Sequence, residues 1–90
     1  MRELPVARIQ IRDEKGKVHS YEYDILVGEM AVSGGISCES YGVRVAEDGG
    51  DCMEIQNLTV SISRIDELLD LLVRNEVTPC TLRDVVDDWL

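Results

Sequence analysis

Two stretches of this chain place apolar side chains at the spacing of an amphipathic helix, i, i+3, i+4, i+7 and i+8. The first stretch has Ile65, Leu68, Leu69, Leu72 and Val73. The second follows a Thr-Pro pair and has Leu82, Val85, Val86, Trp89 and Leu90. A stripe of this kind needs an apolar surface to cover. We therefore expect two helices, each packed by one face on the rest of the protein.

The first helix is predicted over residues 64–74. The stretch from Ser63 to Asp66 resembles a capping box, with Asp where Glu or Gln is usual. Asp66 and Glu67 would then lie in the first turn, where the helix dipole favours acidic side chains. Asn75 is a tolerable residue just past the end, so the helix should stop there.

The second helix has two possible starts. It begins at Pro79 with Thr78 as its cap, or after Thr81 with Asp84 at the third helical position. A residue before proline is pushed away from helical dihedral angles, which separates Thr78 from the first helix. Both starts give the second helix the same apolar face.

The first 62 residues alternate apolar and polar side chains, which is the pattern of half-buried strands. The alternation covers residues 5–12, 20–27, 41–46 and 53–56. Past Asn57 the apolar parity flips, which predicts a bulge in the fourth strand. Residues 13–17 and 47–50 contain glycine and read as turns.

Residues 28–40 have a less regular pattern. Ser33-Gly34-Gly35 is typical of a hairpin tip. The apolar or small residues on its two sides are Met30 and Val32, then Ile36 and Cys38.

These elements predict an α+β fold, a four-stranded antiparallel meander sheet with two C-terminal helices packed on one face. One domain covers residues 1–90, with the sheet in residues 1–62 and the helices in residues 63–90. A hydrophobic fraction of 44% with 30% charged residues fits a soluble globule rather than a disordered chain.

The charge of the chain restricts its partners. The formal net charge is −9, and residues 47–90 alone hold eleven acidic and three basic side chains. This charge disfavours nucleic acid and anionic membranes as partners.

No apolar run approaches the ~20 residues of a membrane span, and the residues after Met1 do not form a signal peptide. Three cysteines, an odd number, fit a reducing compartment better than a disulfide framework. We expect a cytoplasmic protein.

The sequence offers no convincing catalytic, cofactor or metal site. His19 is the only histidine, and no nearby residue clearly supplies the nucleophile or orienting carboxylate that a general base needs. Together with Cys38, Cys52 and Cys80 it could supply four zinc ligands, but no C-x₂₋₄-C pair nucleates such a site. The two Gly-Gly pairs lack the flanking residues of a phosphate loop. We therefore predict a protein that is not an enzyme and that has no cofactor.

Some residues near the C-terminus are better suited to interaction. Leu71 lies off the apolar stripe of the first helix. Asp87 and Asp88 sit at the negative end of the second helix dipole, where acidic groups are unfavourable. Trp89 is large and apolar and should be held by its own sheet or by a second chain. The candidate interaction residues are Leu71, Asp84, Asp87, Asp88 and Trp89.

The segment VTPCTLRDVVDDWL, residues 77–90, resembles the C-terminal end of small uncharacterised bacterial proteins from the clostridial side of the Gram-positives. The strand around Tyr41-Gly42-Val43 is also similar to that group. This resemblance implies a domain of unknown function with no catalytic residues to transfer.

The sequence therefore leaves the function unknown and favours one class over two others. We expect a non-enzymatic domain that contacts a protein partner or a second copy of itself, as a homodimer or a small regulatory subunit. One alternative is a cysteine-dependent enzyme or thiol sensor. The other is an acidic mimic of nucleic acid, which requires rows of carboxylates at phosphate-like spacing.

Overall fold

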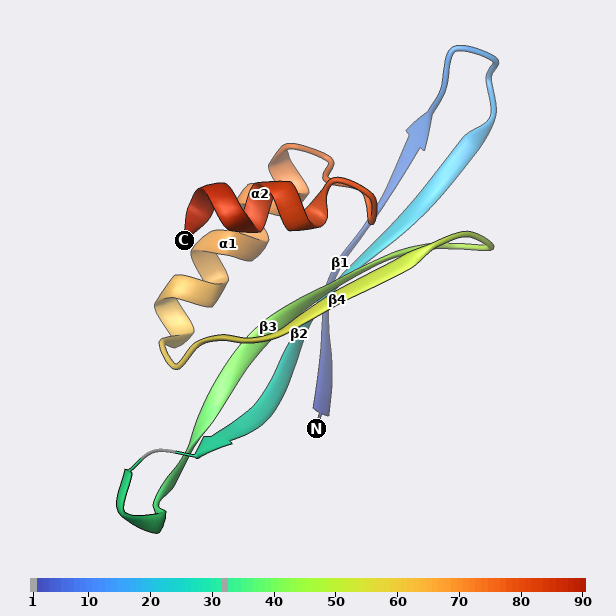
Figure 1. Ribbon diagram of the computed structural model, residues 1–90. Helices are drawn as coiled ribbons and strands as arrows, with labels where there is room; N and C mark the ends of the chain where they lie inside the picture. The colour runs from blue at the N-terminus through green and yellow to red at the C-terminus, as the bar shows by residue number, and fades with distance from the viewer. Residues whose placement is uncertain (1, 32) are drawn as a thin grey trace.

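The computed structural model describes residues 2–31 and 33–90 of the chain. Its strands form one antiparallel sheet in the order β1-β2-β3-β4, and two helices follow (Figure 1). The strands are β1 (Arg2–Arg12), β2 (Val18–Ala31), β3 (Ser37–Glu47) and β4 (Cys52–Thr59). The helices are α1 (Ile62–Arg74) and α2 (Leu82–Trp89). The predicted α+β class and meander are confirmed.

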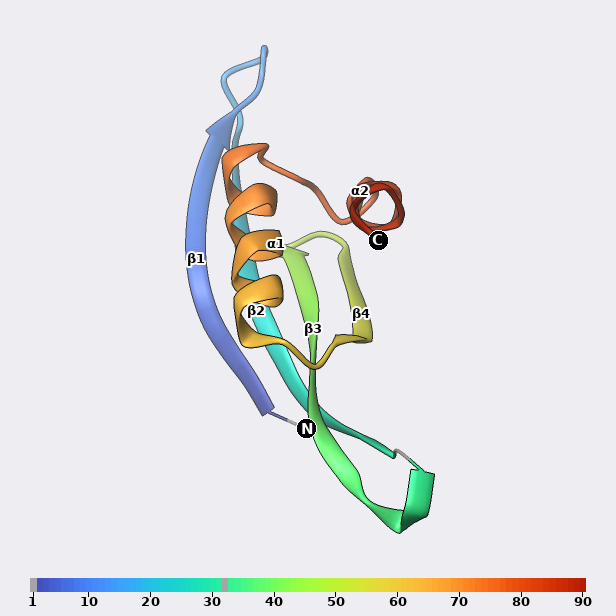
Figure 2. The same cartoon turned by 90° about the vertical axis from the view of Figure 1, so that its left-hand side faces the viewer.

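The hydrophobic core lies between one face of the sheet and the helices. Because side chains alternate along a strand, every second residue of the central strands faces α1. These core positions are Tyr21, Tyr23, Ile25, Val27, Tyr41, Val43 and Val45, and Ile55 of the edge strand β4 joins them. Helix α1 packs across all four strands, and α2 packs against α1 on the same side of the sheet (Figures 1 and 2). Leu82 and Val86 of α2 complete the core.

Both helices are short and buried on one side only. They have thirteen and eight residues. Ile65, Leu68, Leu69 and Leu72 of α1 are buried, as the apolar spacing predicts. Within residues 2–31 and 33–90, neither helix has the length and apolarity that crossing a membrane would require.

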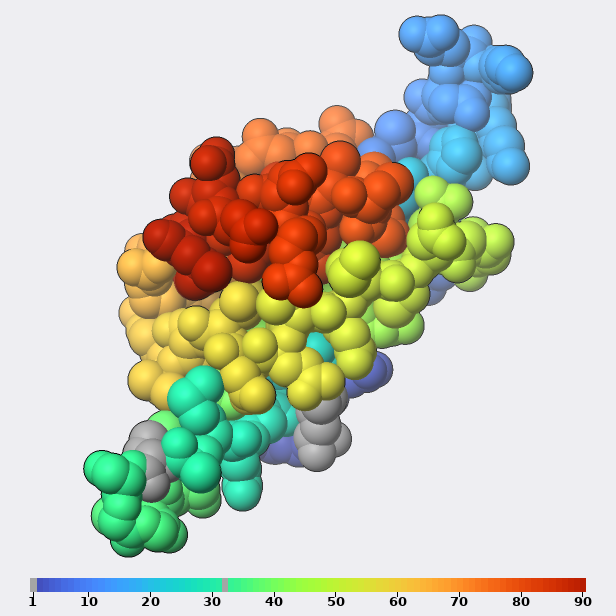
Figure 3. Space-filling model, in the orientation of Figure 1, coloured from blue at the N-terminus to red at the C-terminus, as the bar shows by residue number. Residues whose placement is uncertain are grey.

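The sheet is longer than the helices that cover it. The molecule measures 55 × 23 × 18 Å along its principal axes. The β1–β2 hairpin and the β2–β3 hairpin protrude from opposite ends of the body (Figures 1 and 3). We refer to residues 28–31 and 33–40 of the second hairpin as the arm. Its tip is a short 3₁₀ turn, Ser33–Gly35, at the predicted position. Val32, expected just before this tip, lies outside the described residues.

The predicted bulge in the fourth strand is confirmed. Val43 pairs with Ile55, but Tyr41 pairs with Thr59, so β4 contains extra residues opposite Gly42. Asn57 sits in this bulge with a φ of 55°. A Cβ atom on Gly42 would collide with the carbonyl oxygen of Ile55, so only glycine fits there. A second bulge lies in β1, which begins before the predicted position 5.

The start of α1 differs from the prediction. The cap is Ser61 rather than Ser63, and its hydroxyl accepts a hydrogen bond from the backbone N–H of Arg64 at 3.3 Å. The helix therefore begins at Ile62, and the acidic residues expected in the first turn lie beyond it. Ser61 has the extended dihedral angles that a cap requires, because it comes directly after the strand region. Ser63 is already helical.

Helix α1 ends where the sequence predicts, in a Schellman motif. Glu76 takes a φ of 51°. Its N–H donates to the carbonyl of Val73 at 3.2 Å, and the N–H of Val77 donates to the carbonyl of Leu72 at 3.0 Å. These two bonds define the motif, whose left-handed position is usually glycine. Here glutamate occupies it.

Of the two predicted starts for the second helix, the later one is observed. Helix α2 begins after Thr81, and Asp84 is its third residue. Thr78 to Thr81 form a turn in which the N–H of Thr81 donates to the carbonyl of Thr78 at 3.1 Å. Pro79 fits its second position because its φ is already fixed near the required value.

Candidate functional site

The two helices leave an apolar groove between them. Its lining residues are Leu71 of α1 with Val85, Asp88 and Trp89 of α2, and its volume is about 220 Å³. We call this the α1–α2 groove. The side chains of Leu71, Val85 and Trp89 are half-buried and pack against the edge of the core.

The helical period explains how these residues meet. Val85, Asp88 and Trp89 are three and four residues apart, so they share one face of α2. Leu71 follows Leu68 by three residues and lies beside the buried stripe of α1. From the sequence, Leu71 was expected off the apolar stripe of α1. Because α2 packs alongside α1, Leu71 forms one wall of the groove.

Trp89 is held by α1. The guanidinium carbon of Arg64 lies 4.4 Å from the centre of the indole ring. Such a cation over an aromatic face is attracted by the ring quadrupole. This contact covers one face of the ring, and Trp89 also lines the groove. Trp89 also packs against the edge of the hydrophobic core, and its contact with a second chain stays a prediction.

The structure brings three of the five predicted interaction residues together. Leu71, Asp88 and Trp89 line the α1–α2 groove. Asp84 and Asp87 are exposed and do not line it. Successive residues turn by about 100° around a helix, so Asp87 projects away from the groove even though it is adjacent to Asp88.

Sequence reasoning missed Arg64 as part of this site. Its contact with Trp89 joins residues that are twenty-five positions apart in two helices. No local spacing predicts a contact of this kind. Val85 was recognised only as an apolar position of the second helix.

The rim of the groove is acidic. The last turn of α2 contains no basic residue to offset the negative end of the helix dipole. Asp88 is the exposed carboxylate that lines the groove, Asp87 lies beside it on the neighbouring face of α2, and Asp84 lies in the first turn. On α1, Asp70 is paired with Arg74 at 3.2 Å. A cation supplied from outside would therefore meet the carboxylate of Asp88 beside an apolar surface.

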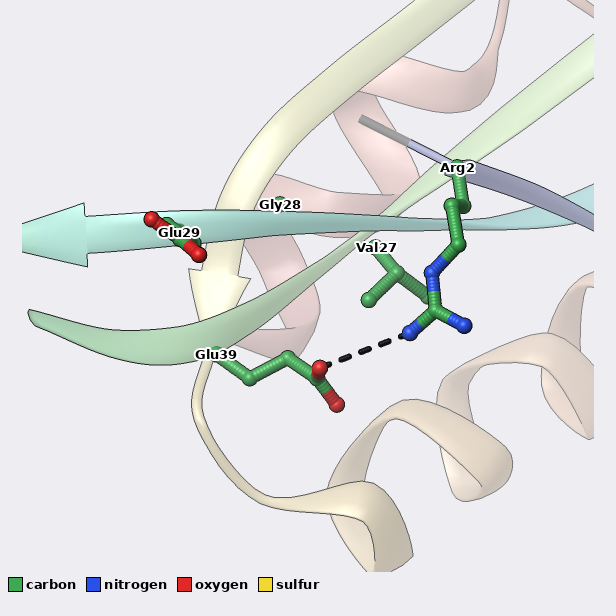
Figure 4. Close-up of a pocket in the computed structure, with 5 residues that line it drawn as sticks. All are labelled: Arg2, Val27, Gly28, Glu29 and Glu39. Carbon is green, nitrogen blue, oxygen red and sulfur yellow. Dashed lines mark hydrogen bonds and ion pairs between the residues drawn. The ribbon is translucent and has the colours of Figure 1, made fainter.

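Two further hollows lie at the base of the arm. Arg2 of β1 reaches over β2 to Glu39 of β3, and their closest atoms are 3.4 Å apart (Figure 4). On one side of this ion pair is an open hollow of about 500 Å³, which Val27, Gly28 and Glu29 also line. On the other is an apolar hollow of about 250 Å³. Its lining is Arg2, Leu4, Ile25, Val27, Glu39, Tyr41, Ile62, Ile65 and Asp66.

His19 lies between two carboxylates that the sequence did not reveal as neighbours. Its Nε2 is 2.9 Å from an oxygen of Asp13, and its Nδ1 is 3.7 Å from an oxygen of Glu47. Hydrogen bonding to His19 and to the backbone of Lys17 holds the pKa of Asp13 below its usual value. The imidazole ring of His19 stacks on the ring of Tyr21. Through these contacts His19 links the turn after β1 to the end of β3. Within the described residues, no hydroxyl or thiol forms a hydrogen bond with the imidazole.

The cysteines are spread over the molecule. Cys38 lies in the arm, Cys52 begins β4, and Cys80 lies in the turn before α2. All three are free. Across the part of the chain that the structure describes, no three His, Cys, Asp or Glu side chains gather in a group suited to a metal ion.

The face of the sheet opposite the helices is polar at its centre. Arg44 donates to the carboxylate of Asp24 at 3.0 Å, and Asp24 is 2% exposed. A buried carboxylate needs such a partner. The ion pair with Arg44 therefore supplies a partner for the buried carboxylate on this face.

Residues 2–90 match the model of DUF6514, a family of unknown function. The chain belongs to this family. No curated protein and no solved structure matches it. The resemblance to a domain of unknown function is thereby confirmed, and the match assigns no activity.

Proposed function

We propose that this DUF6514 domain is a non-enzymatic protein-binding module that docks a basic segment of a partner protein in the α1–α2 groove. The observation that carries the proposal is the convergence of Leu71, Val85 and Trp89 beside the exposed carboxylate of Asp88. Tryptophan is strongly enriched among the residues that dominate interface energies. The partner segment would place one aliphatic side chain in the groove and lysine or arginine on the rim.

Charge supports a basic partner over a second copy at this groove. Residues 47–90 carry eleven acidic and three basic side chains. Two copies meeting groove to groove would bring Asp88 and its neighbours close to their own equivalents, and like charges in contact are costly. A basic segment removes that cost and speeds encounter through electrostatic steering.

The two alternative functions have less support. The three cysteines lie in separate elements, so a thiol-based enzyme or sensor would have to rely on one residue without a second cysteine beside it. The acidic surface of the helices is interrupted by Arg64, Arg74 and Arg83, which fits poorly with rows of carboxylates that imitate a phosphate backbone. Free and partly exposed thiols support a reducing, cytoplasmic location.

The proposal is tested through the fluorescence of Trp89, the only tryptophan in the chain. The probe is a synthetic amphipathic peptide with leucines four residues apart and lysines elsewhere. Binding should shift the emission to shorter wavelength, because the indole becomes covered. Raising the salt concentration should weaken the affinity, since exposed charges are screened. A peptide with glutamate in place of lysine should not bind.

Variants then localise the binding. Leu71→Ser should reduce affinity for the lysine peptide by removing part of the apolar wall. Asp88→Asn should weaken binding more than Asp87→Asn, because only Asp88 lines the groove. Equal effects of the two asparagine variants, or binding that survives Leu71→Ser unchanged, would contradict docking in the groove.

A further inference from the structure

The arm ends in an unusual uncharged segment. Residues 30–38 contain no charged side chain, in a chain of which 30% is charged. Ile36 is 65% exposed at this end. An exposed hairpin tip is normally polar, because a large apolar side chain in water gains free energy when it is covered. The tip therefore has the chemistry of a contact surface.

Among the described residues, the side chains of the arm contact the rest of the molecule at its base, where Glu39 pairs with Arg2 and the hydroxyl of Ser40 donates to Asn57. The arm extends beyond both helices as a two-stranded ribbon (Figure 1). A two-stranded hairpin alone is marginally stable in water. Glu29 and Glu39 face each other across its base, an unfavourable pairing of like charges that the ion pair between Glu39 and Arg2 offsets in part. A surface that covers the arm would stabilise it.

The apolar hollow at the base of the arm is a surface of matching chemistry. Its walls are Leu4 and Ile62, which are 45% and 61% exposed. Its floor is formed by core residues that include Ile25, Val27 and Tyr41. Arg2, Glu39 and Asp66 contribute both signs of charge to the rim, so an uncharged segment enters without repulsion from either.

We propose that two copies of this chain exchange arms, the tip of each seated in the apolar hollow at the base of the other. The hollow begins near Val27, and about seven residues separate this position from the tip, or roughly 23 Å of strand. A two-fold axis through the middle of two antiparallel arms places each tip beside the partner's hollow. The interface is then isologous and closed.

The contact with a second copy is small. The arm and the lining of the hollow include about 20 residues of each chain, but Ile25, Val27, Ser40, Tyr41 and Ile65 are already buried. About 15 residues are left to be covered, below the range of a standard interface, so the dimer should be of modest affinity. The exchange also keeps Glu29 and Glu39 of each copy beside the partner's uncharged tip. This surface is separate from the α1–α2 groove, so a dimer would present two grooves to basic partners.

Sedimentation at micromolar concentration tests the exchange. The wild-type chain should be a dimer that raised salt does not dissociate, because the contact is apolar. Ile36→Lys and Leu4→Lys should each give a folded monomer with unchanged circular dichroism. Val18→Lys is the matched control: Val18 is 47% exposed in the other hairpin, and its variant should remain a dimer. A monomeric wild type, or a dimer that persists in both arm-site variants, would overturn the proposal.

Cross-linking provides a second test. In a background with Cys38→Ser, Cys52→Ser and Cys80→Ser, the changes Leu4→Cys and Ile36→Cys are combined. Leu4 pairs with Ile25, and β2 runs on for about 20 Å from there to its end. A disulfide within one chain is therefore excluded, because its Cα atoms must lie within about 7 Å. Oxidation should give covalent dimers. Chains that stay uncross-linked would contradict the exchange, whatever peptide binding at the groove shows.

Discussion

The hydroxyl of Tyr23 donates a hydrogen bond of 2.8 Å to the carbonyl oxygen of Val77, fifty-four positions along the chain. This contact ties the centre of β2 to the turn that follows α1. Tyr23 is fully buried, and burial, with lesser contributions from Tyr21 and Glu76, raises its pKa to about 12. The bond therefore holds the returning chain in position for α2.

Tyr23→Phe should lower the free energy of unfolding by about 1–2 kcal/mol, because the buried carbonyl of Val77 loses its partner. Urea unfolding followed by circular dichroism measures the change. Tyr41→Phe is the control, since that hydroxyl donates to the partly exposed carboxylate of Glu39. A loss for Tyr23→Phe no larger than that of the control would show that the Val77 bond contributes little.

The same residue predicts a pH dependence. The folded pKa of Tyr23 is raised above the ordinary value of 10.0 to about 12. Its contribution to stability is therefore complete below pH 10.0 and is lost as the pH rises through the folded pKa. Stability measured across this window should fall more steeply in the wild type than in Tyr23→Phe. Parallel curves would mean that Tyr23 does not govern alkaline unfolding.

Leu69→Ala should cost roughly 2–5 kcal/mol, the range for truncating a buried leucine. Leu69 is 2% exposed and lies in the middle of the stripe that α1 buries. Leu90→Ala is the matched control, because Leu90 is 68% exposed. Chemical denaturation measures both variants, and a cost below ~1 kcal/mol at Leu69 would place it outside that range for a core leucine.

Gly42→Ala should destabilise the protein by about 1–3 kcal/mol, as overpacking does. The added methyl group would meet the backbone of Ile55 and Gln56, and a bulge held by backbone has little room to move. At Gly28 the same change meets only one side-chain atom, at 4.0 Å. Thermal unfolding of Gly28→Ala should therefore stay close to the wild type, while Gly42→Ala melts at lower temperature.

Glu76→Gly should stabilise the protein by up to about 1 kcal/mol. Glu76 has a φ of 51°, a left-handed conformation that costs roughly 1–2 kcal/mol for a residue with a Cβ atom, part of which the more flexible unfolded glycine gives back. Glu76→Ala separates this effect from loss of charge, because alanine keeps the strain. Equal stabilisation by both variants would assign the gain to the charge instead.

Removing residues 87–90 should leave a folded but less stable protein. The deletion takes away Trp89 and its contact with Arg64, while Leu82 and Val86 remain in the core. The loss of stability should persist at high salt, since it comes mainly from apolar contact. Thermal melts at two salt concentrations measure it, and an unchanged melting temperature would identify these residues as a passive tail.

The sequence predicted the layers of this fold because each element carries its own period. The apolar stripe from Ile65 to Leu72 reflects burial of one helix face, and the parity change after Asn57 reflects the bulge in β4. Both are local patterns that can be read from the sequence. The start of α1 was harder. Ser61 and Ser63 both satisfy the composition of a cap, and the path of the chain leaving β4 decides between them.

The candidate site was only partly predictable. Val85 and Trp89 are four residues apart, so their shared face on α2 follows from the helical period. The wall formed by Leu71 and the cover provided by Arg64 depend on how α2 lies against α1. The carboxylates on either side of His19 come from two turns brought together by the sheet. Contacts of this kind, between separate elements, cannot be predicted from the local spacing of residues.

The consecutive order of the strands bears on how the chain folds. Each strand pairs with the one before it through a short connection, so little loop entropy opposes sheet formation and folding should be rapid. During synthesis, however, the apolar side of β1 to β4 is complete before any of α1 has left the ribosome. The nascent sheet therefore exposes its apolar face to water before the helices cover it. Chaperones that bind extended apolar segments would bind the chain at that stage.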